Sequence, residues 1–508
     1  MLSNYKMTNF FFLFSTMMIA SYTDDDTICA ISTPAGMGGI AVIRISGRDA
    51  MPIVARCWKG AAIEQMKSHT AHLGRIIDPA DGSVLDEVVL TVFRAPHSFT
   101  GEDVIEISCH GSPWIQQEMV NLLIRCGCRA ATGGEFTRRA FTNGRLDLSQ
   151  AEAVADVIAS SSRASHRIAM SQMRGDFSRE LSMLRERLLH FVSLMELELD
   201  FSEEEVEFAD RRHLVALADE IRGVIARLTD SFAVGNAIKN GLPVAIVGET
   251  NAGKSTLLNY LLHDDRALVS DIHGTTRDVI EDTITLGGTL FRFIDTAGIR
   301  QTTDRIEEMG IERTFRKMSE AQIVLWVIDG TTPIDEIAPL AARILPTISA
   351  GNAVEELSTE CTGGVADGTC AAKRLIAVVN KGDLLSRGQE AALRDALAGM
   401  LPAGTPTIII SAREHTNLDA LQQALLHAAA LPDNDANEVI VTNARHYAAL
   451  AKAGEAIARA IGGLQAGISG DFVSQDIREC MHYLGEITGE ITPTDVLTTI
   501  FQHFCIGK

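Results

Sequence analysis

The most informative residues of this chain form a glycine-rich loop, Gly248–Ser255, directly after the apolar run Leu242–Val247. In such a loop the glycines let backbone N–H groups turn toward phosphates, Lys254 reaches the β- and γ-phosphates, and the Ser255 hydroxyl ligates Mg²⁺. The phosphates lie at the N-terminus of the helix that begins near Lys254, where the aligned peptide dipoles favour anions. The spacing therefore predicts a nucleoside triphosphate site.

Three segments downstream identify the base. Asp295–Gly298, Asn380–Asp383 and Ser411–Arg413 each follow a short run of β-branched and aliphatic residues. Asp295 approaches Mg²⁺ through water. The Asp383 carboxylate accepts both the N1–H and the 2-amino hydrogens of guanine, whereas adenine offers neither donor. The four segments, in this order, predict a GTPase.

One absence bears on how GTP is hydrolysed. Small regulatory GTPases place a water-orienting glutamine where this chain has Ile299, and an aliphatic side chain cannot align a nucleophile. Two features are candidates to assist GTP hydrolysis in place of the glutamine. One is Asn251 in the phosphate loop, and the other is the segment Ser270–Asp278, whose Thr276 is the natural switch threonine for Mg²⁺ and the γ-phosphate. Asn251 and the switch carbonyls can cage a monovalent cation against the phosphates. The alternative for Asn251 is a turn residue that tolerates left-handed backbone.

The elements that must position these residues follow from periodicity. Alternating runs such as Ile40–Ile45 and Val88–Phe93, with a helix near Trp114–Arg125, predict a small α+β domain. From Ser149 to about Glu203 apolar residues recur at helical spacing, which predicts long helices of a bundle, and the helical pattern resumes near Asn443. The GTPase module lies between these helical parts, as if inserted into the bundle.

The fold class expected is therefore a multidomain α/β plus α protein, with an N-terminal α+β domain, a central helical bundle and an inserted Ras-like P-loop GTPase domain whose mixed sheet is flanked by helices. The boundaries are 1–23 for an N-terminal extension, 24–146 for the α+β domain, 147–240 and 432–508 for the two helical parts, and 241–431 for the GTPase domain, in which 347–373 is expected to be a flexible insertion.

Composition limits the function. The formal net charge of −21 argues against broad, charge-driven binding to nucleic acid, so that any RNA contact must be local or supplied by a partner. The nine cysteines are scattered without paired CxxC spacing, which argues against a disulfide framework and a zinc site and fits a reducing, cytoplasmic home.

The first residues of the chain are ambiguous. Lys6 precedes the apolar run Phe10–Ala20, which resembles a secretory h-region and is too short to span a bilayer, so no stable membrane insertion is expected. A mitochondrial presequence is disfavoured because no arginine precedes Arg44. The alternative to export is an upstream extension, with translation starting at Met17 or Met18.

Several further motifs are distinctive: Thr33–Gly39, Ser98–Asp103, Gly134–Thr137, Leu146–Ala153, Leu484–Glu490 and the terminal Phe504–Lys508. Through these motifs the chain resembles, from Asp25 to Lys508, the MnmE (TrmE) family of tRNA uridine 5-carboxymethylaminomethyl modification GTPases.

The resemblance implies that the N-terminal domain forms a homodimer and binds a tetrahydrofolate derivative of the 5-formyl type. Its expected contacts are Arg44, Glu106, Arg145 and Lys508. Arg145 stands where the family often has lysine, and this exchange keeps the charge but changes the geometry.

The resemblance also implies activation by K⁺, with Asn251, Ser270, Ile272 and Thr275 as ligands, and Mg²⁺ on Ser255 and Thr276. The catalytic water is expected on Glu307, with Glu308 as the neighbour open to confusion, and Lys254 and Thr276 complete the catalytic set. From the residues alone Glu307 is a solvated helix carboxylate. From the residues alone Cys505 is an inert or buried cysteine near the terminus. The resemblance places it beside a folate contact and implies a chemical role as the alternative.

The motifs and the resemblance together give the expected GTP contacts. They are Asn251, Ala252, Gly253, Lys254, Ser255, Thr256, Ser270, Asp271, Ile272, His273, Gly274, Thr275, Thr276, Asp295, Thr296, Ala297, Gly298, Asn380, Lys381, Asp383, Ser411, Ala412 and Arg413.

The family's reaction installs an aminomethyl or carboxymethylaminomethyl group at carbon 5 of the wobble uridine of certain tRNAs. It works with an FAD-dependent partner, MnmG (GidA), in an expected heterotetramer in which the partner binds much of the tRNA. Two rivals stay open: a ribosome-assembly or regulatory RNA-binding GTPase, whose basic RNA-binding module is not evident here, and a folate-binding protein that uses GTP only for assembly.

Overall fold

The computed structural model describes residues 26–200, 211–266, 282–294, 318, 320–352, 373–429 and 439–491, together with Leu497, Ile500, Phe501, Phe504, Ile506 and Gly507. Contacts divide the chain into two units. The first comprises 1–155, 173–178 and 485–508, and the second comprises 156–172 and 179–484. Each unit is described by itself.

The first unit is built on a seven-stranded sheet of order β3-β4-β5-β6-β2-β1-β7, which is antiparallel except for the parallel pair β1–β7. Its strands are β1 (Ile28–Ile31), β2 (Ile40–Ser46), β3 (Trp58–Lys59), β4 (Thr70–Ile77), β5 (Val84–Phe93), β6 (Val104–His110) and β7 (Arg129–Ala130). Its helices are α2 (Ala50–Ala55), α3 (Pro113–Cys126), α4 (Glu135–Thr142) and the start of α5 (Leu148–Ala159), with a short 3-10 turn η1 (Ile63–Gln65). The runs predicted as strands and the helix predicted near Trp114 are confirmed.

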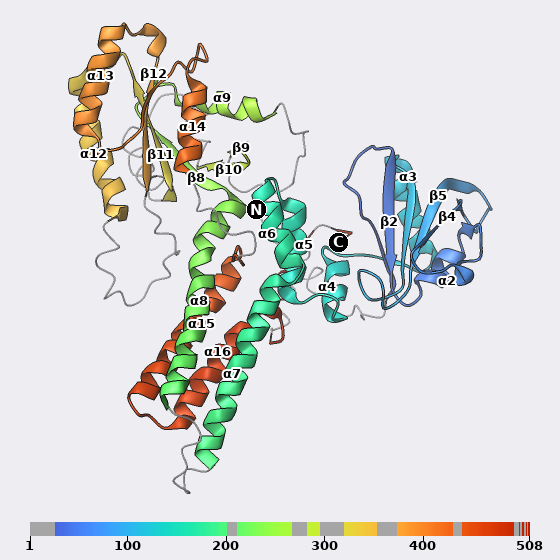
Figure 1. The fold of residues 1–508 in the computed structure, drawn as a ribbon. Coiled ribbons are helices and arrows are strands. Elements are labelled where there is room, and N and C mark those ends of the chain that lie inside the picture. Colours follow the sequence, from blue (N-terminus) through green and yellow to red (C-terminus); the bar gives the residue numbers. More distant parts are fainter. Residues whose placement is uncertain are drawn as a thin grey trace, which may run out of the picture. The chain divides into compact units, whose positions relative to one another are not determined.

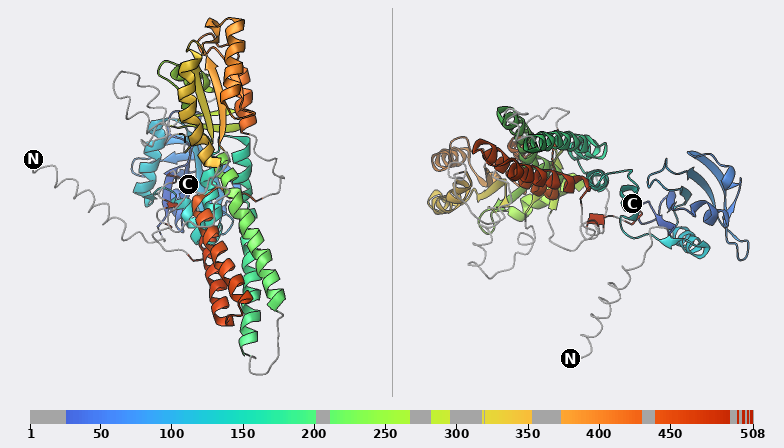
Figure 2. Two further views of the ribbon diagram at one scale, coloured as in Figure 1. Left: turned by 90° about the vertical axis from the view of Figure 1, so that its left-hand side faces the viewer. Right: turned by 90° about the horizontal axis from the view of Figure 1, so that it is seen from below.

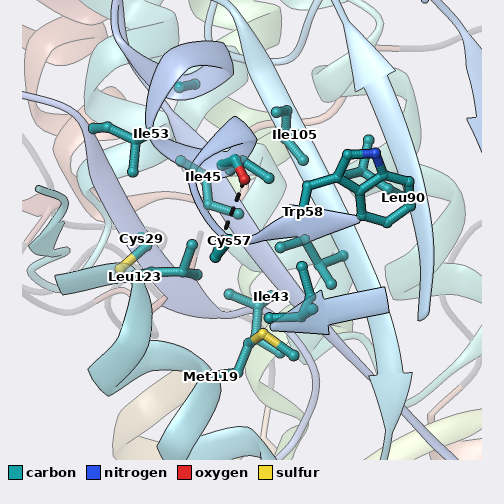
Figure 3. Close-up of a cluster of buried hydrophobic side chains, with 14 of the residues drawn as sticks. Cys29, Ile43, Ile45, Ile53, Cys57, Trp58, Leu90, Ile105, Met119 and Leu123 are labelled. Atoms are coloured by element: carbon teal, nitrogen blue, oxygen red, sulfur yellow. Dashed lines mark hydrogen bonds between the residues drawn. The ribbon is translucent and has the colours of Figure 1, made fainter. Parts of the chain in front are cut away.

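The core of this unit lies on one face of the sheet, under α2 and α3 (Figure 1). Alternate residues of the strands point into it, and Ile43, Ile45 and Leu90 are fully buried (Figure 3). Helix α3 begins with Pro113 and ends at Gly127, whose left-handed backbone (φ 118°) lets the chain turn back into β7. Alternation of period two thus places one face of β2, β5 and β6 in the core and leaves the other face for other contacts.

The C-terminal segment belongs to the first unit, although it is the most distant part of the sequence. Ile506 forms an isolated β-bridge with Gly133, and the Ser32 hydroxyl donates to Gly507 O at 3.1 Å. A Cβ on Gly507 would lie 2.2 Å from Ile31 O, so only glycine permits this approach to the end of β1. The terminal motif is thereby held beside the strand that neighbours β2.

The second unit contains a six-stranded sheet of order β13-β12-β11-β8-β10-β9, parallel except for the antiparallel hairpin β9–β10. Its strands are β8 (Leu242–Val247), β9 (Asp282–Leu286), β10 (Thr289–Phe293), β11 (Ile323–Asp329), β12 (Arg374–Asn380) and β13 (Thr407–Ile409). The helices beside it are α9 (Lys254–Arg266), α12 (Ile334–Asn352), α13 (Arg387–Met400) and α14 (Leu418–Ala428), with the 3-10 turn η4 (Gly382–Leu384). This is the predicted mixed sheet flanked by helices.

Both faces of this sheet are buried, as parallel strands require. Val244 and Ile246 of β8 pack in one core with Leu257 of α9 and residues of α14. Ala245 and Val247 point into a second core, which holds residues of α12 and α13 on the opposite face (Figures 1 and 2). The carboxyl ends of β8, β11 and β12 therefore meet at one edge, where the predicted motifs follow them.

The remaining helices are α6 (Arg163–Met173), α7 (Asp176–Asp200), α8 (Arg211–Asn240), α15 (Ala444–Gln465) and α16 (Gly470–Thr488). In the second unit α7, α8, α15 and α16 run side by side (Figures 1 and 2). The predicted helical stretch from Ser149 is interrupted after Met173, because Gly175 adopts left-handed backbone (φ 83°) and separates α6 from α7. None of the described helices has the length and apolarity needed to cross a membrane.

The expected flexible insertion 347–373 needs a correction at its first residues. Helix α12 continues to Asn352, and residues 353–372 lie outside the described part of the chain. Ile337, Ala341 and Ile344 recur at helical spacing and are buried against the sheet, and this apolar stripe anchors a helix that the glycine- and threonine-rich composition concealed.

Candidate functional site

The phosphate loop joins β8 to α9 in the predicted context of a strand, a loop and a helix N-terminus. Gly248 (φ 149°) cannot carry a side chain, because a Cβ would lie 2.1 Å from Val327 O on the neighbouring strand. Lys254 is the first residue of α9, and its Nζ donates to Gly248 O at 2.7 Å and to Glu249 O. The ammonium group therefore lies over the loop, where phosphate oxygens can take the place of these carbonyl acceptors.

Asn380, the last residue of β12, ties three of the predicted motifs together. Its side-chain amide donates to Ala252 O of the phosphate loop at 2.8 Å and accepts from Ala412 N at 2.9 Å. A Cβ on Gly253 (φ 93°) would lie 2.0 Å from Asn380 Nδ2, so the glycine is required for this contact. The amide is buried, and both bonds are sheltered from water.

The base-reading turn follows Asn380 at once. Lys381 adopts left-handed backbone (φ 63°), and Asp383 lies exposed in η4. The Lys381 ammonium pairs with Asp329, which ends β11 and is the register partner of Asn380. Burial acts to raise the pKa of Asp329, but hydrogen bonds from Lys381 and Thr331 and the lysine charge lower it overall. Asp329 thus stays ionised and fixes the lysine.

Asp329 is a site residue that the sequence reading missed. The available signal was its place at the end of the apolar strand Ile323–Asp329, next to a glycine whose N–H donates to Asn380 O at 2.9 Å.

The Ser411–Arg413 segment is the last of the predicted nucleotide motifs. Ser411 is buried and forms an isolated β-bridge with Thr416, and Arg413 is exposed.

Asn251 has left-handed backbone (φ 65°), which agrees with the turn interpretation of this residue. The cation role of Asn251 stays a prediction. Ser255 and Thr256 lie in the first turn of α9.

Many predicted site residues lie outside the described part of the chain, and the structure tests none of them. They are Ser270, Asp271, Ile272, His273, Gly274, Thr275, Thr276, Asp295, Thr296, Ala297, Gly298, Glu307, Cys505 and Lys508.

In the first unit, the structure pairs Arg44 with Glu106. The two residues are register partners on β2 and β6, on the face opposite the core, and their side chains form an ion pair at 2.8 Å. The Arg44 guanidinium lies 5.4 Å from the Phe99 ring centroid and 5.7 Å from that of Phe136. The pair therefore sits among aromatic rings, half-buried.

Arg145 lines a pocket of roughly 350 Å³ in the same unit. The pocket is lined by His69, Phe93, His97, Ser98, Phe99 and Arg145. The aliphatic part of Arg145 crosses Gly101 (φ 81°), where a Cβ would lie 3.1 Å from Arg145 Cγ. Phe99 thus borders both this pocket and Arg44, and three of the four predicted folate contacts, Arg44, Glu106 and Arg145, lie in the described part of this unit.

Two of the motifs that carry the family resemblance, Ser98–Asp103 and Gly134–Thr137, build the scaffold of this region. Glu135 is 1% exposed and is bonded by Arg129 at 2.6 Å and Arg139 at 3.2 Å. Arg139 also bonds Glu102 at 3.1 Å, and the Ser46 hydroxyl donates to Glu102 at 2.6 Å. This network joins the Ser98–Asp103 loop to α4 and to β2, so its charges position the loop.

Comparisons with known proteins agree with this architecture. A family model described as "GTP-binding protein TrmE N-terminus" matches residues 27–145, and one described as "MnmE helical domain" matches residues 148–505. The tRNA modification GTPase MnmE of Bacteroides thetaiotaomicron is 55% identical over 489 residues, which are 96% of this chain and the whole of that protein. The protein of the same name from Flavobacterium johnsoniae is 49% identical over 488 residues, covering 96% of this chain and all of its own length.

Among solved structures, a GTP-binding protein from Sulfolobus solfataricus in complex with GDP is similar at 19% identity and a TM-score of 0.23. The match covers 48% of this chain and 66% of that one.

Proposed function

Because the chain belongs to the tRNA modification GTPase MnmE family, it is an enzyme that hydrolyses GTP in the modification of tRNA, and we propose how it does so. We propose a K⁺-activated homodimer that acts in the cytoplasm with an FAD-dependent partner of the MnmG type. Together they install an aminomethyl or carboxymethylaminomethyl group at carbon 5 of the wobble uridine, with the carbon supplied by a tetrahydrofolate derivative.

The observation that carries the nucleotide part is the convergence on Asn380. One buried amide holds the phosphate loop at Ala252 and the Ser411–Arg413 segment at Ala412. Phosphate and base are therefore bound by parts that share one anchor. Lys254 supplies charge to the β- and γ-phosphates, and the Asp383 carboxylate accepts the N1–H and 2-amino hydrogens of guanine.

Hydrolysis is assigned by the family resemblance to residues beyond this anchor. Ser255 and Thr276 hold Mg²⁺, and Asn251, Ser270, Ile272 and Thr275 hold K⁺, which adds positive charge at the phosphates where other GTPases use an arginine. Glu307 positions the attacking water.

The folate part is supported by the chemistry of the first unit. A pterin ring presents paired N–H donors to a carboxylate, and Glu106 is such an acceptor, held at 2.8 Å by Arg44. Phe99 offers a ring face next to Arg44, and Arg145 offers a cation for the ligand's carboxylates. Ile506 and Gly507 lie against Gly133 and Ser32, and we propose Lys508, the next residue of the chain, as a further contact of the ligand.

The charge balance supports a division of labour with the partner. A chain of net charge −21 has little basic surface for RNA, so we assign most of the tRNA contact to the partner and the folate carbon and GTP-driven motion to this chain. GTP and K⁺ would bring two GTPase domains of the dimer together, and hydrolysis would reset them.

The test is complementation of a strain that lacks this gene, with tRNA nucleosides measured by mass spectrometry. The wild-type chain should restore the modified wobble uridine, and Glu307→Ala should restore neither this nucleoside nor GTP turnover in the purified protein. Full modification with Glu307→Ala, at lost turnover, favours the rival in which GTP serves only assembly. Absence of any 5-formyl-tetrahydrofolate binding to the full chain favours the regulatory RNA-binding GTPase.

A further inference from the structure

The pocket beside Arg145 has an unusual lining for this chain. The sequence carries 66 acidic and 45 basic residues, yet the lining has three side chains with N–H donors and two aromatic rings, and no carboxylate. The donors are His69, His97 and Arg145, and all three residues are exposed. We call these three residues the rim of the pocket, and a rim of this kind fits an anionic ligand.

His69 is held in a strained backbone conformation. Its φ of 63° is uncommon for a residue with a side chain, and its backbone N–H is fixed to Val92 O at 2.7 Å. The ring stands edge-on to Phe93, with centroids 5.4 Å apart. Its Nδ1 is 2.9 Å from Ser68 Oγ, which already accepts Arg94 N–H at 3.0 Å.

These bonds decide which ring atom of His69 is available. When the Ser68 hydroxyl donates its one proton to Nδ1, the neutral ring carries its own proton on Nε2, so Nε2–H is the donor left for a ligand. A protonated ring donates from the same atom.

The loop that carries His97 and Phe99 is fixed at several points. His97 N–H donates to Arg94 O at 2.9 Å, and the buried Ser98 hydroxyl donates to Glu102 O at 2.6 Å. Asn143, two residues before Arg145, donates to Thr100 O at 2.8 Å. The rim donors are therefore held on a preorganised frame, which lowers the entropy cost of binding.

We propose that His69, His97 and Arg145 bind the glutamyl carboxylates of a reduced folate that carries an oligo-γ-glutamate tail, so that this rim selects the long-tailed cofactor. The inference rests on the proposed folate function. Phe99 borders Arg44, the partner of Glu106, on one side and the rim on the other. A pterin bound at Glu106 thus directs its benzoyl-glutamate end across Phe99 and into the rim, where each further glutamate adds one carboxylate.

The test measures binding of 5-formyl-tetrahydrofolate with one and with five glutamates to the full-length protein by calorimetry. The pentaglutamate form should bind ~10-fold or more tightly than the monoglutamate form, and His69→Ala and His97→Ala should each reduce that ratio by about 3- to 10-fold, the size of one typical net hydrogen bond. His72→Ala is the matched control, since His72 lies on the same strand region but outside the lining and bonds Thr70 instead. Its ratio should equal that of the wild type.

Each other outcome points elsewhere. Equal affinity for both tail lengths overturns the inference while leaving the folate function intact. If the histidine variants lose affinity for both forms in the same proportion, these residues contact the part of the ligand that both forms share, and the inference is overturned as well. If neither form binds, the proposed folate function itself fails. Reduced tRNA binding by His69→Ala, with unchanged folate ratios, would assign the rim to RNA instead.

Discussion

Removal of the Asn380 side chain tests the nucleotide site most directly. Its amide spans 2.8 Å to Ala252 O and 2.9 Å to Ala412 N, and these two residues are 0% and 2% exposed. In Asn380→Ala the carbonyl and the N–H both lose their partner, and a buried polar group without one costs about 1–3 kcal/mol. We therefore expect the free energy of unfolding to fall by ~2–6 kcal/mol, summed over the two groups.

The same substitution should weaken GDP binding by about tenfold or more, which corresponds to ~1.4 kcal/mol. The physical reason is that the phosphate loop and the Ser411–Arg413 segment lose their common anchor. Asn236→Ala is the matched control, because it removes only an exposed hydrogen bond, which the Asn240 side-chain amide of α8 donates to Asn236 Oδ1. A surface change of this kind should shift stability by no more than about 0.5 kcal/mol.

The assays are denaturant unfolding with and without GDP, and titration with a fluorescent GDP analogue. If Asn380→Ala stays within about 0.5 kcal/mol of the wild type in unfolding and binds GDP with unchanged affinity, the amide does not hold these segments together and the reasoning is refuted. A stability loss without any loss of GDP affinity would confine the role of Asn380 to the fold.

Three further predictions follow from the sites. Asp383→Asn should lower the preference for GTP over XTP by ~100-fold or more in competition assays, because an amide offers one acceptor where guanine needs two; an unchanged preference would misplace the base reader. Replacing K⁺ with Na⁺ at equal ionic strength should slow GTP turnover ~10-fold or more, and equal rates would remove the cation from the mechanism. Burial acts to raise the pKa of the Glu135 carboxyl, but bonds from Arg129 and Thr132 and the arginine charges lower it from 4.5 to about 2. Because the folded state binds fewer protons, this contribution of ~3 kcal/mol is complete above pH ~4.5 and is lost as the pH falls toward ~2. Glu135→Gln should therefore lower stability at neutral pH and flatten the acid-unfolding curve, and curves of equal slope would contradict this.

Local patterns in the sequence were enough for the elements and for the nucleotide motifs. Strand runs such as Ile40–Ile45 and the helix start at Lys254 were predicted because period-two and helical spacing act within a few residues. Predictions were less accurate where local composition misled. The helix α12 continues to Asn352, and its buried residues Ile337, Ala341 and Ile344 pack on the sheet before the glycine-rich stretch begins.

The roles of individual charged residues needed the structure. Glu135 and Glu102 belong to motifs that carry the family resemblance, yet their partners Arg129, Arg139 and Ser46 show that they hold the scaffold together. Asp329, which fixes Lys381, carried only the weak signal of a strand end. The charge of a residue can be read from the sequence, but its ion-pair or hydrogen-bond partner depends on which strands and helices lie next to each other.

Guanine nucleotide chemistry could be predicted from the amino-acid sequence, because the spacing of a phosphate loop and a base-reading turn is a property of contiguous residues. How these segments meet depends on the fold: parallel pairing of β8, β11 and β12 puts their carboxyl ends at one edge and lets Asn380 reach Ala252, 128 residues earlier in the chain. It likewise placed His69, His97 and Arg145 around one pocket and returned Gly507 to Ser32. Such contacts join residues far apart in the chain, and burial and strand pairing, which act in three dimensions, select them.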